Sequence, residues 1–432
     1  MMEARQTGDV KFFGSRVGLL CWLALVLDGF DLVVLGALIP HLTGSEQEWM
    51  SAAQATFIST IGMVGMTVGA LFLGVATDKM GRRVLMIAAV FLFSLFTLLC
   101  GFAMDPWQLA AYRFVAGIGL GGCLPTAIAL TTEFSQGAGQ RHTGRVSTIL
   151  MTGYNVGAMA TALLGLWLLP YAGWRPLFWV AGIAGLFLSG VMIILLPESP
   201  TFLWIKNRGS EAQSLAKRYG FVFSSLSQEA PKKIPMTSFL KPPLLLLNGM
   251  LWVATFMGLL LIYSLNTWLP TLMVAADYGL EQGLSFLFLL NSGAIFGLLV
   301  MGVMGDIFGL NRVVVICYLA GGGMLALLSV HMPFVFLCGA IFFAGSFLFS
   351  AQVLIYAFTA ASHSASVRAS ALGMAAGIGR LGAIIGPLVG GVLIAYELGH
   401  SFGFYVFSMA SLLAAFAMFI AGQLAGSVKN LY

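Results

Sequence analysis

The chain has 432 residues, of which 59% are hydrophobic and only 9% are charged, and its mean hydropathy is +0.96. Charged residues approach a quarter of an ordinary soluble domain, so this composition excludes a soluble globular protein. The formal net charge of +5 comes from basic residues dispersed through short loops, and this dispersion argues against a nucleic-acid-binding surface.

Twelve apolar runs are long enough to cross a bilayer as helices. We place them at 17–40, 53–77, 84–104, 107–131, 146–170, 176–196, 246–270, 283–305, 313–331, 334–360, 370–395 and 403–425. The longest break, 197–245, divides them six and six. The sequence therefore predicts an all-α membrane protein with an N-terminal six-helix bundle (1–196), a cytoplasmic central loop (197–245) and a C-terminal six-helix bundle (246–432).

The distribution of basic residues predicts the orientation. With the N-terminus in the cytoplasm, all but three of the 21 Lys and Arg residues lie in cytoplasmic segments. Only Arg175 lies in an external loop, while Arg113 and Arg380 lie inside apolar runs. Positive charge is retained on the cytoplasmic side, so we expect both termini to be cytoplasmic.

Asp28 and Asp31 lie near the middle of the first apolar run. A charge at that depth costs at least about 2.5–3.5 kcal/mol, so such residues usually serve a function. Their i, i+3 spacing places both on nearly one face, where two like charges favour retention of a proton. We interpret the pair as the proton-handling element of a transporter. The alternative is a structural pair that is bonded to neighbouring helices or to an arginine.

The two halves repeat each other. In the loops after the second and eighth runs, Asp78 matches Asp306 and Gly81 matches Gly309, both at an offset of 228 residues. The fifth and eleventh runs carry glycine pairs at an offset of 229 (Gly153 and Gly157, Gly382 and Gly386). Two features at nearly one offset indicate duplicated bundles. Such folds bind substrate near the bilayer midplane.

Arg380 lies about eleven residues into the eleventh run. Its planar guanidinium stays charged and fits a carboxylate, so we expect it to hold the carboxylate of a substrate. The alternative is a buried partner for an acid on another helix. Further candidate substrate-binding residues are polar or aromatic and fall at a similar depth: Tyr154, Asn155, Tyr263, Asn266 and Gln352. Any one of these five could instead make an interhelical hydrogen bond.

The five cysteines lie in apolar runs without a CxxC pair (Cys21, Cys100, Cys123, Cys317 and Cys338). We therefore expect no disulfide framework, no metal site and no cofactor. The five histidines map to loops or to the ends of the runs, which leaves the carboxylates to carry protons. A membrane enzyme would need a nucleophile–base or metal cluster, and no such grouping is evident.

The loop from Gly74 to Arg83 resembles the signature GxxxD[RK]xG[RK][RK] of the major facilitator superfamily. Further resemblances lie at Arg113 with Gly117 and at the PESP element that begins at Pro197. Three further elements point to one family within this superfamily: Asp28-Gly29-Phe30-Asp31, Asn266 to Pro270, and Gly379 to Pro387. Together they resemble the aromatic acid:proton symporter family, which imports hydroxylated benzoates and related aromatic carboxylates in bacteria.

The resemblance implies roles for further residues. Arg113 would pair with Asp28 or Asp31 and tune proton release, although a static salt bridge is the alternative. A gate that closes by ion pairs would include six residues: Gly74, Asp78, Gly81, Arg82, Asp306 and Arg312. Simple positive-inside anchoring is the alternative for the basic ones. Ile307 stands where the second loop usually has a basic residue, so that gate is expected to be weaker.

The sequence thus predicts a monomeric symporter, not an enzyme, in the bacterial cytoplasmic membrane. A proton and an aromatic carboxylate such as a hydroxybenzoate would enter together. Another organic acid, aliphatic or alicyclic, is the alternative substrate. A drug:proton antiporter fits less well, because an arginine at the midplane does not suit cationic drugs. A sensor would need an added signalling domain, for which 197–245 is short.

Overall fold

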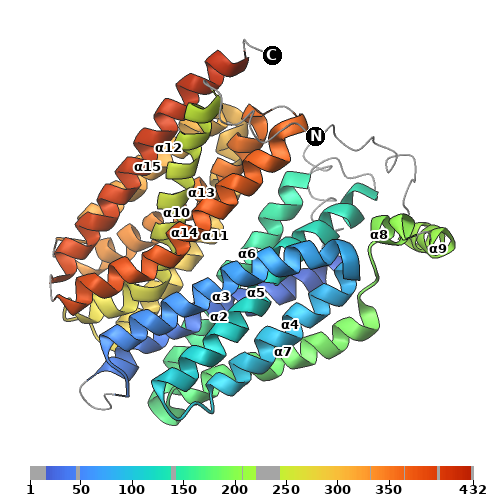
Figure 1. Ribbon diagram of the computed structural model, residues 1–432. Coiled ribbons are helices and arrows are strands. Elements are labelled where there is room, and N and C mark those ends of the chain that lie inside the picture. The colour runs from blue at the N-terminus through green and yellow to red at the C-terminus, as the bar shows by residue number, and fades with distance from the viewer. Residues whose placement is uncertain are drawn as a thin grey trace. The chain divides into compact units, whose positions relative to one another are not determined.

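The computed structural model describes residues 16–44, 49–137, 143–206, 208–219, 244–330, 332–363, 365–396 and 399–429. Within these ranges, twelve helices are long and apolar enough to cross a membrane, which confirms the predicted spans (Figure 1). They are α2 (Arg16–Thr43), α3 (Ala52–Met80), α4 (Arg82–Cys100), α5 (Pro106–Gly137), α6 (Thr143–Ala172), α7 (Arg175–Leu195), α10 (Leu244–Val274), α11 (Leu280–Phe308), α12 (Leu310–Leu327), α13 (Phe334–Ser362), α14 (Ala365–Ala395) and α15 (Gly399–Lys429).

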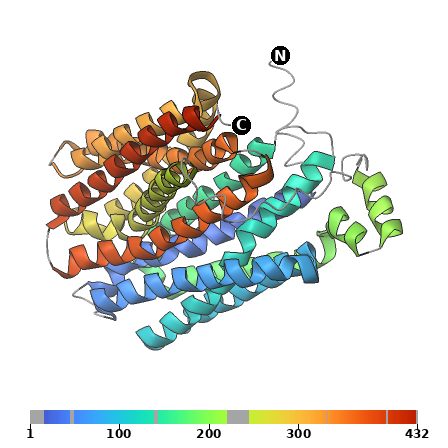
Figure 2. The same ribbon diagram turned by 45° about the horizontal axis from the view of Figure 1, so that its top comes forward.

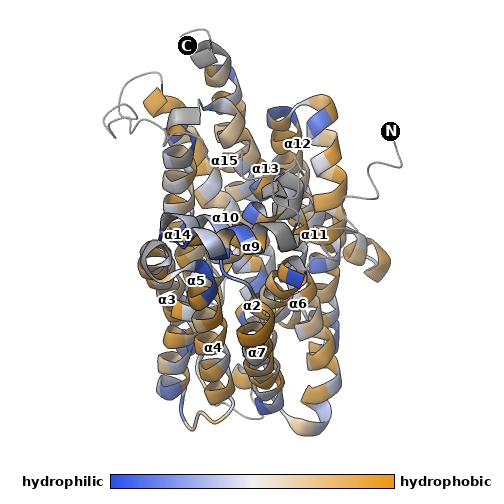
Figure 3. Ribbon diagram, turned by 90° about the vertical axis from the view of Figure 1, so that its right-hand side faces the viewer, coloured by the Kyte–Doolittle hydropathy of each residue, from blue (hydrophilic) through white to orange (hydrophobic). Residues whose placement is uncertain are grey.

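The helices carry large apolar side chains on their outer faces as well as inside. Phe187, Ile194 and Phe72 are 75%, 80% and 71% exposed. Figure 3 shows α4 and α7 predominantly in the colour of hydrophobic residues along their length. Such surfaces suit lipid, where a helix satisfies all its backbone hydrogen bonds internally.

The chain folds into two compact units. One comprises Met1–Val34 with Ile61–Glu229, and the other comprises Leu35–Thr60 with Ala230–Tyr432. In the first unit, α4 packs on both α5 and α7. In the second unit, α10 packs on α14, α11 on α13, and α12 on α15 (Figure 2).

Equivalent glycines bring two helices into backbone contact in each unit. In the first unit, a Cβ added to Gly157 of α6 would collide with the carbonyl oxygen of Val26 in α2. In the second unit, a Cβ on Gly386 of α14 would lie 2.7 Å from the carbonyl oxygen of Leu260 in α10. Small residues permit such close helix approach, and the matching contacts extend the repeat from sequence to packing.

The central segment contains two short helices, α8 (Pro200–Ile205) and α9 (Gly209–Tyr219), that hydropathy did not predict. Ser199 caps the N-terminus of α8: its hydroxyl accepts the amide N–H of Phe202, and Pro200 occupies the first turn. Figure 1 shows both helices beyond the end of α7. The remainder of the predicted loop, from 220 to 243, lies outside the described residues.

Candidate substrate and proton sites

A buried ion pair joins Asp31 of α2 to Arg113 of α5. Arg113 Nη1 donates to Asp31 Oδ2 at 2.7 Å, and Nη2 donates to the Asp31 carbonyl oxygen at 3.0 Å. The two side chains are 1% and 4% exposed. The Thr97 hydroxyl of α4 donates to the other carboxylate oxygen. Three helices are therefore connected through one aspartate.

Asp28 lies one turn earlier on α2 and is also buried, with 2% exposure. The segment around it is pressed against α6, because a Cβ on Gly29 would collide with the backbone of Tyr154. Thr161 of α6 donates to the Phe30 carbonyl oxygen at 3.1 Å. The structure therefore brings Asp28 to the interface of α2 and α6, where the predicted residues Tyr154 and Asn155 lie.

Asn155 is 2% exposed, and its Nδ2 donates to the Met151 carbonyl oxygen at 3.3 Å. Its Oδ1 makes no hydrogen bond with any described residue. A buried amide oxygen without a donor is costly, so this atom has the capacity to accept a hydrogen bond from a ligand.

In the second unit, three residues from three helices gather around Tyr356 of α13. Its hydroxyl lies close enough to the Gln352 side chain, to Arg380 of α14 and to Tyr263 of α10 to interact with them electrostatically. Arg380 is half-buried. Gly379, next to it, has Leu259 and Thr255 methyl groups within 2.8 Å of an added Cβ, so the helices meet closely here. The structure thus brings together three predicted binding residues, and Tyr356 joins them.

The Gln352 amide is held in one orientation. Tyr318 of α12, which is fully buried, places its hydroxyl 3.4 Å from Gln352 Oε1. Gly258 of α10 leaves the space that both groups occupy. Gln352 is 3% exposed, and its Nε2 makes no hydrogen bond among the described residues. A donor in that position is available to an acceptor such as a ring hydroxyl or a carboxylate oxygen.

Asn266, another predicted binding residue, makes an interhelical hydrogen bond. Asn291 Nδ2 of α11 donates to Asn266 Oδ1 at 3.1 Å, and Asn266 Nδ2 donates to the Ile262 carbonyl oxygen. Trp268 is fully buried and donates to the Pro387 carbonyl oxygen at 2.9 Å. These bonds fasten α10 to α11 and to α14.

The predicted gate of the first half forms a network among α4, α5 and the segment before α8. Arg82 is ion-paired with Glu133, which also accepts the Ser199 hydroxyl. Glu198 Oε1 accepts the amide N–H groups of Arg82 and Arg83, each at 3.0 Å. A carboxylate at the start of α4 is favoured by the helix dipole.

Gly81 precedes this helix with φ +98°, and a Cβ there would lie 2.6 Å from Glu198 Oε2. Gly309, its repeat partner, precedes α12 with φ +91°. The loops thus share a backbone turn that favours glycine.

The other predicted gate residues are less constrained by the structure. Asp306 and Arg312, on either side of Gly309, are exposed, and neither is in an ion pair with another described residue. The surroundings of Gly74 and the side chain of Asp78 lie outside the description. The gating roles of these four residues therefore stay predictions.

Sequence reasoning did not identify Thr97, Glu133 or Tyr318. Glu133 was detectable as an acid at the end of an apolar run, but Thr97 and Tyr318 carry no local signal. Within the described residues, no group of three or more His, Cys, Asp and Glu side chains could hold a metal ion.

Residues 21–298 match the Major Facilitator Superfamily. The chain is 33% identical to the benzoate transport protein of Acinetobacter baylyi, over 94% of this chain and 89% of that protein. It is 32% identical to the gallate transporter of Pseudomonas putida, over 94% and 91% of the two chains. It is also 32% identical to the gentisate transporter of Corynebacterium glutamicum, over 93% and 86%.

Solved structures share the fold. The xylose transporter XylE from E. coli, in a partially occluded inward-open conformation, matches with a TM-score of 0.74 at 15% identity over 95% of this chain and 99% of that chain. A D-xylose-proton symporter matches with a TM-score of 0.70, also at 15% identity, over 94% and 97%. With twelve spanning helices and these relatives, the chain belongs to the major facilitator superfamily, among its aromatic acid transporters, and is not an enzyme.

Proposed function

We propose that the protein is a proton-coupled symporter that imports an aromatic carboxylate such as a hydroxybenzoate. The observation that carries this proposal is the cluster of Arg380, Tyr356, Tyr263 and Gln352 in the second unit. A guanidinium for a carboxylate lies there beside phenol rings that can stack on an aromatic ring. Relatives named as benzoate, gallate and gentisate transporters support an aromatic substrate.

Binding of the anion begins at Arg380, which offers a planar pair of donors. The Gln352 Nε2 and the Tyr356 hydroxyl then bond substituents of the ring. Tyr154, Asn155 and Asn266 stay further candidate binding residues, and within the first unit the Asn155 Oδ1 atom can accept a hydrogen bond from a hydroxyl group. Loss of one charge-assisted hydrogen bond costs about 1.5–3 kcal/mol, so Arg380→Ala should weaken binding roughly 10- to 150-fold.

Proton coupling is assigned to Asp28. Asp31 already has Arg113 and Thr97 as partners, which suits it to a structural link between α2, α4 and α5. Asp28 accepts a proton from the outside, where the gradient supplies it, and releases it inside with the substrate. Arg113 and Asp31 then keep α2 and α5 in register while Asp28 changes charge.

The gating role is assigned to the network of Arg82, Glu133 and Glu198, on the predicted cytoplasmic side. It ties the start of α4 to the end of α5 and to the segment before α8, and it must loosen when the inside opens. Asp306 and Arg312 form the weaker counterpart of the second half. Both termini lie in the cytoplasm, and the protein works as a monomer.

The test is uptake of labelled 4-hydroxybenzoate into proteoliposomes, with and without an inward acid gradient. We expect accumulation above equilibrium only with the gradient. Asp28→Asn should abolish accumulation but retain counterflow exchange, because exchange needs no net proton movement. Arg380→Ala should lose both activities, while Arg368→Ala, which removes an exposed arginine from the start of α14, should retain both.

The outcomes separate the parts of the proposal. Gradient-driven accumulation by Asp28→Asn would refute the proton assignment and leave the substrate class intact. Unchanged substrate affinity in Arg380→Ala would refute the carboxylate site. Competition by aliphatic or alicyclic acids, without competition by benzoates, would favour the second candidate, a symporter of a non-aromatic organic acid.

A further inference from the structure

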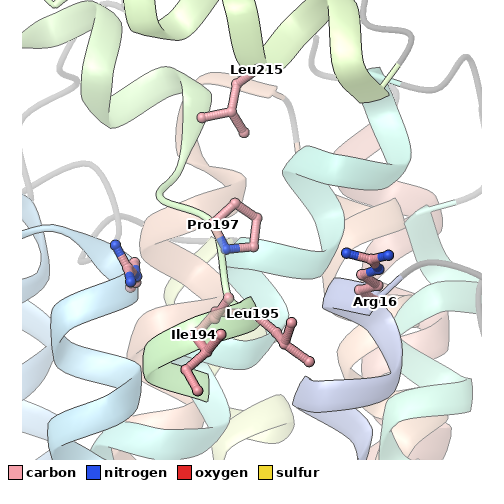
Figure 4. Close-up of a pocket in the computed structure, with 7 residues that line it drawn as sticks. Arg16, Ile194, Leu195, Pro197 and Leu215 are labelled. Atoms are coloured by element: carbon pink, nitrogen blue, oxygen red, sulfur yellow. The ribbon is translucent and has the colours of Figure 1, made fainter. Parts of the chain in front are cut away.

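A cavity of about 230 Å³ lies within the first unit, where α2 begins, α4 begins and α7 ends. Two arginines, Arg16 and Arg83, line it together with apolar side chains that include Ile194, Leu195 and Leu215. Figure 4 shows Arg16 on one side of Leu195 and Pro197, with Leu215 of α9 beyond them. The cavity therefore combines positive charge with an apolar wall at the end of three membrane helices.

The positive charge of this cavity is not neutralised by the described residues. Neither Arg16 nor Arg83 takes part in an ion pair among them. Arg83 Nη2 donates to the Ile193 carbonyl oxygen at 2.5 Å, but its Nε is buried and makes no hydrogen bond with a described residue. Arg16 is exposed.

Two acids whose side chains are described near this end of α4 already have other partners. Glu198 Oε1 accepts the amide N–H groups of Arg82, Arg83 and Ser199. Glu133 is bonded to Arg82 and Ser199. With Arg16, Arg82 and Arg83 against Glu133 and Glu198, these five side chains carry one positive charge in excess, and an anion would be attracted here.

A second cavity, of about 450 Å³, shares Arg83 and continues along the groove of α4 and α7. Val84, Phe91 and Ile193, which line it, are 46%, 48% and 56% exposed. From Arg83 to Phe91 the helix rises by about 12 Å, at roughly 1.5 Å per residue. An apolar groove of this length would accommodate the upper part of an acyl chain.

We propose that these two cavities form a binding site for an anionic phospholipid. Arg16 and Arg83 hold its phosphate, since guanidinium groups fit phosphate oxygens in a forked geometry. One acyl chain lies along Val84, Ile87 and Phe91. On the predicted topology the lipid belongs to the cytoplasmic leaflet, whose anionic lipids attract basic residues.

The site is adjacent to the network of Glu198 and Glu133. A lipid phosphate on Arg83 would hold the start of α4 against the end of α7, where Arg83 already contacts the Ile193 carbonyl oxygen. The ordinary alternative is that Arg83 serves only to complete the last turn of α7, and that Arg16 is a simple interfacial anchor. That alternative predicts no preference among lipid headgroups.

The experiment titrates the purified full-length protein in detergent with dioctanoyl phosphatidylglycerol, dioctanoyl phosphatidylcholine or inorganic phosphate, and measures bound lipid by native mass spectrometry. We expect phosphatidylglycerol to bind at least about tenfold more tightly than phosphatidylcholine, because the choline cation of the latter is repelled by the excess positive charge of this site. Arg16→Gln and Arg83→Gln should each reduce this preference, and the double variant should bring it to within about twofold.

Two control variants separate headgroup from chain. Arg368→Gln removes an equal charge from an exposed arginine of α14 and should leave the preference unchanged. Ala88→Phe fills the groove between α4 and α7 and should weaken phosphatidylglycerol binding, while Ala111→Phe on an exposed position of α5 should not.

Three results would overturn the proposal. The first is equal binding of the two lipids by the unaltered protein. The second is an undiminished preference in Arg16→Gln, which alters only an exposed side chain and leaves the helix contacts intact. The third is a combination of two observations: inorganic phosphate competes fully with phosphatidylglycerol, and Ala88→Phe has no effect on lipid binding. That combination would identify a site for a free anion instead of a lipid.

Discussion

The ion pair of Asp31 and Arg113 provides a direct test of how charge is balanced in the first unit. The perturbation is a double-mutant cycle of Asp31→Asn, Arg113→Gln and the combined variant. Each single substitution leaves a charged partner buried at 1–4% exposure without its counter-charge. At the N–O distance of 2.7 Å the attraction is about 6 kcal/mol for an effective dielectric constant near 20.

Part of that attraction only offsets the cost of removing both charges from water. The free energy of unfolding should therefore fall by about 3–5 kcal/mol in each single variant. The combined variant leaves no unpaired charge, so its loss should be smaller than the sum by at least about 2 kcal/mol. The Thr97 hydroxyl can still donate to the amide oxygen of Asn, which limits the damage to the ion pair itself.

The assay is unfolding of the purified protein by titration with sodium dodecyl sulfate in mixed micelles, followed by circular dichroism. Asp306→Asn, at an exposed acid of α11, is the matched control and should change stability little. Additive losses in the combined variant would refute the reasoning, because they would mean that the two charges do not stabilise each other.

Three further predictions concern other contacts. Tyr318→Phe removes the hydroxyl that orients Gln352, the residue proposed to bond a ring substituent. The affinity for 4-hydroxybenzoate should therefore fall by up to about tenfold more than the affinity for benzoate, as measured by competition assays. An equal fall for the two substrates would count against this role. Glu133→Gln removes the carboxylate that is ion-paired with Arg82, and the free energy of unfolding should fall by about 1–2 kcal/mol. This loss is smaller than the one expected for Asp31→Asn, because the pair of Arg82 and Glu133 is partly exposed. A loss as large as that of Asp31→Asn would contradict the prediction. Burial lowers the pKa of His363, so below about pH 6.5 the unfolded chain binds a proton more readily than the folded protein does. The free energy of unfolding should therefore fall as the pH falls from about 7 to about 5, and His363→Gln should make this dependence on pH less steep. An unchanged dependence in the variant would exclude the histidine as its source.

The twelve spans were predictable because a spanning helix must be long and apolar whatever its neighbours are. The same reasoning missed α8 and α9, since short polar helices leave no hydropathy signal. The Ser199-Pro200 pair was the local cue, with a capping hydroxyl followed by proline in the first turn.

The choice between Asp28 and Asp31 as the partner of Arg113 was not predictable from spacing. Both lie on nearly one face of α2, and a small rotation of the helix decides which faces α5. That rotation is fixed by the contact of Gly29 with Tyr154, which is a tertiary feature. Thr97 was unpredictable for the same reason, because a threonine in an apolar run becomes a donor only when a carboxylate is placed beside it.

The glycine contacts constrain how the protein can move. Where α6 meets α2 at Gly157, and α14 meets α10 at Gly386, backbone lies on backbone with no side chain between them. Side chains at an interface can change rotamer and absorb displacement, but a backbone contact has no such freedom. Each pair of helices should therefore move as one rigid body during transport, and bending must be confined to parts of the helices that lie away from these crossings.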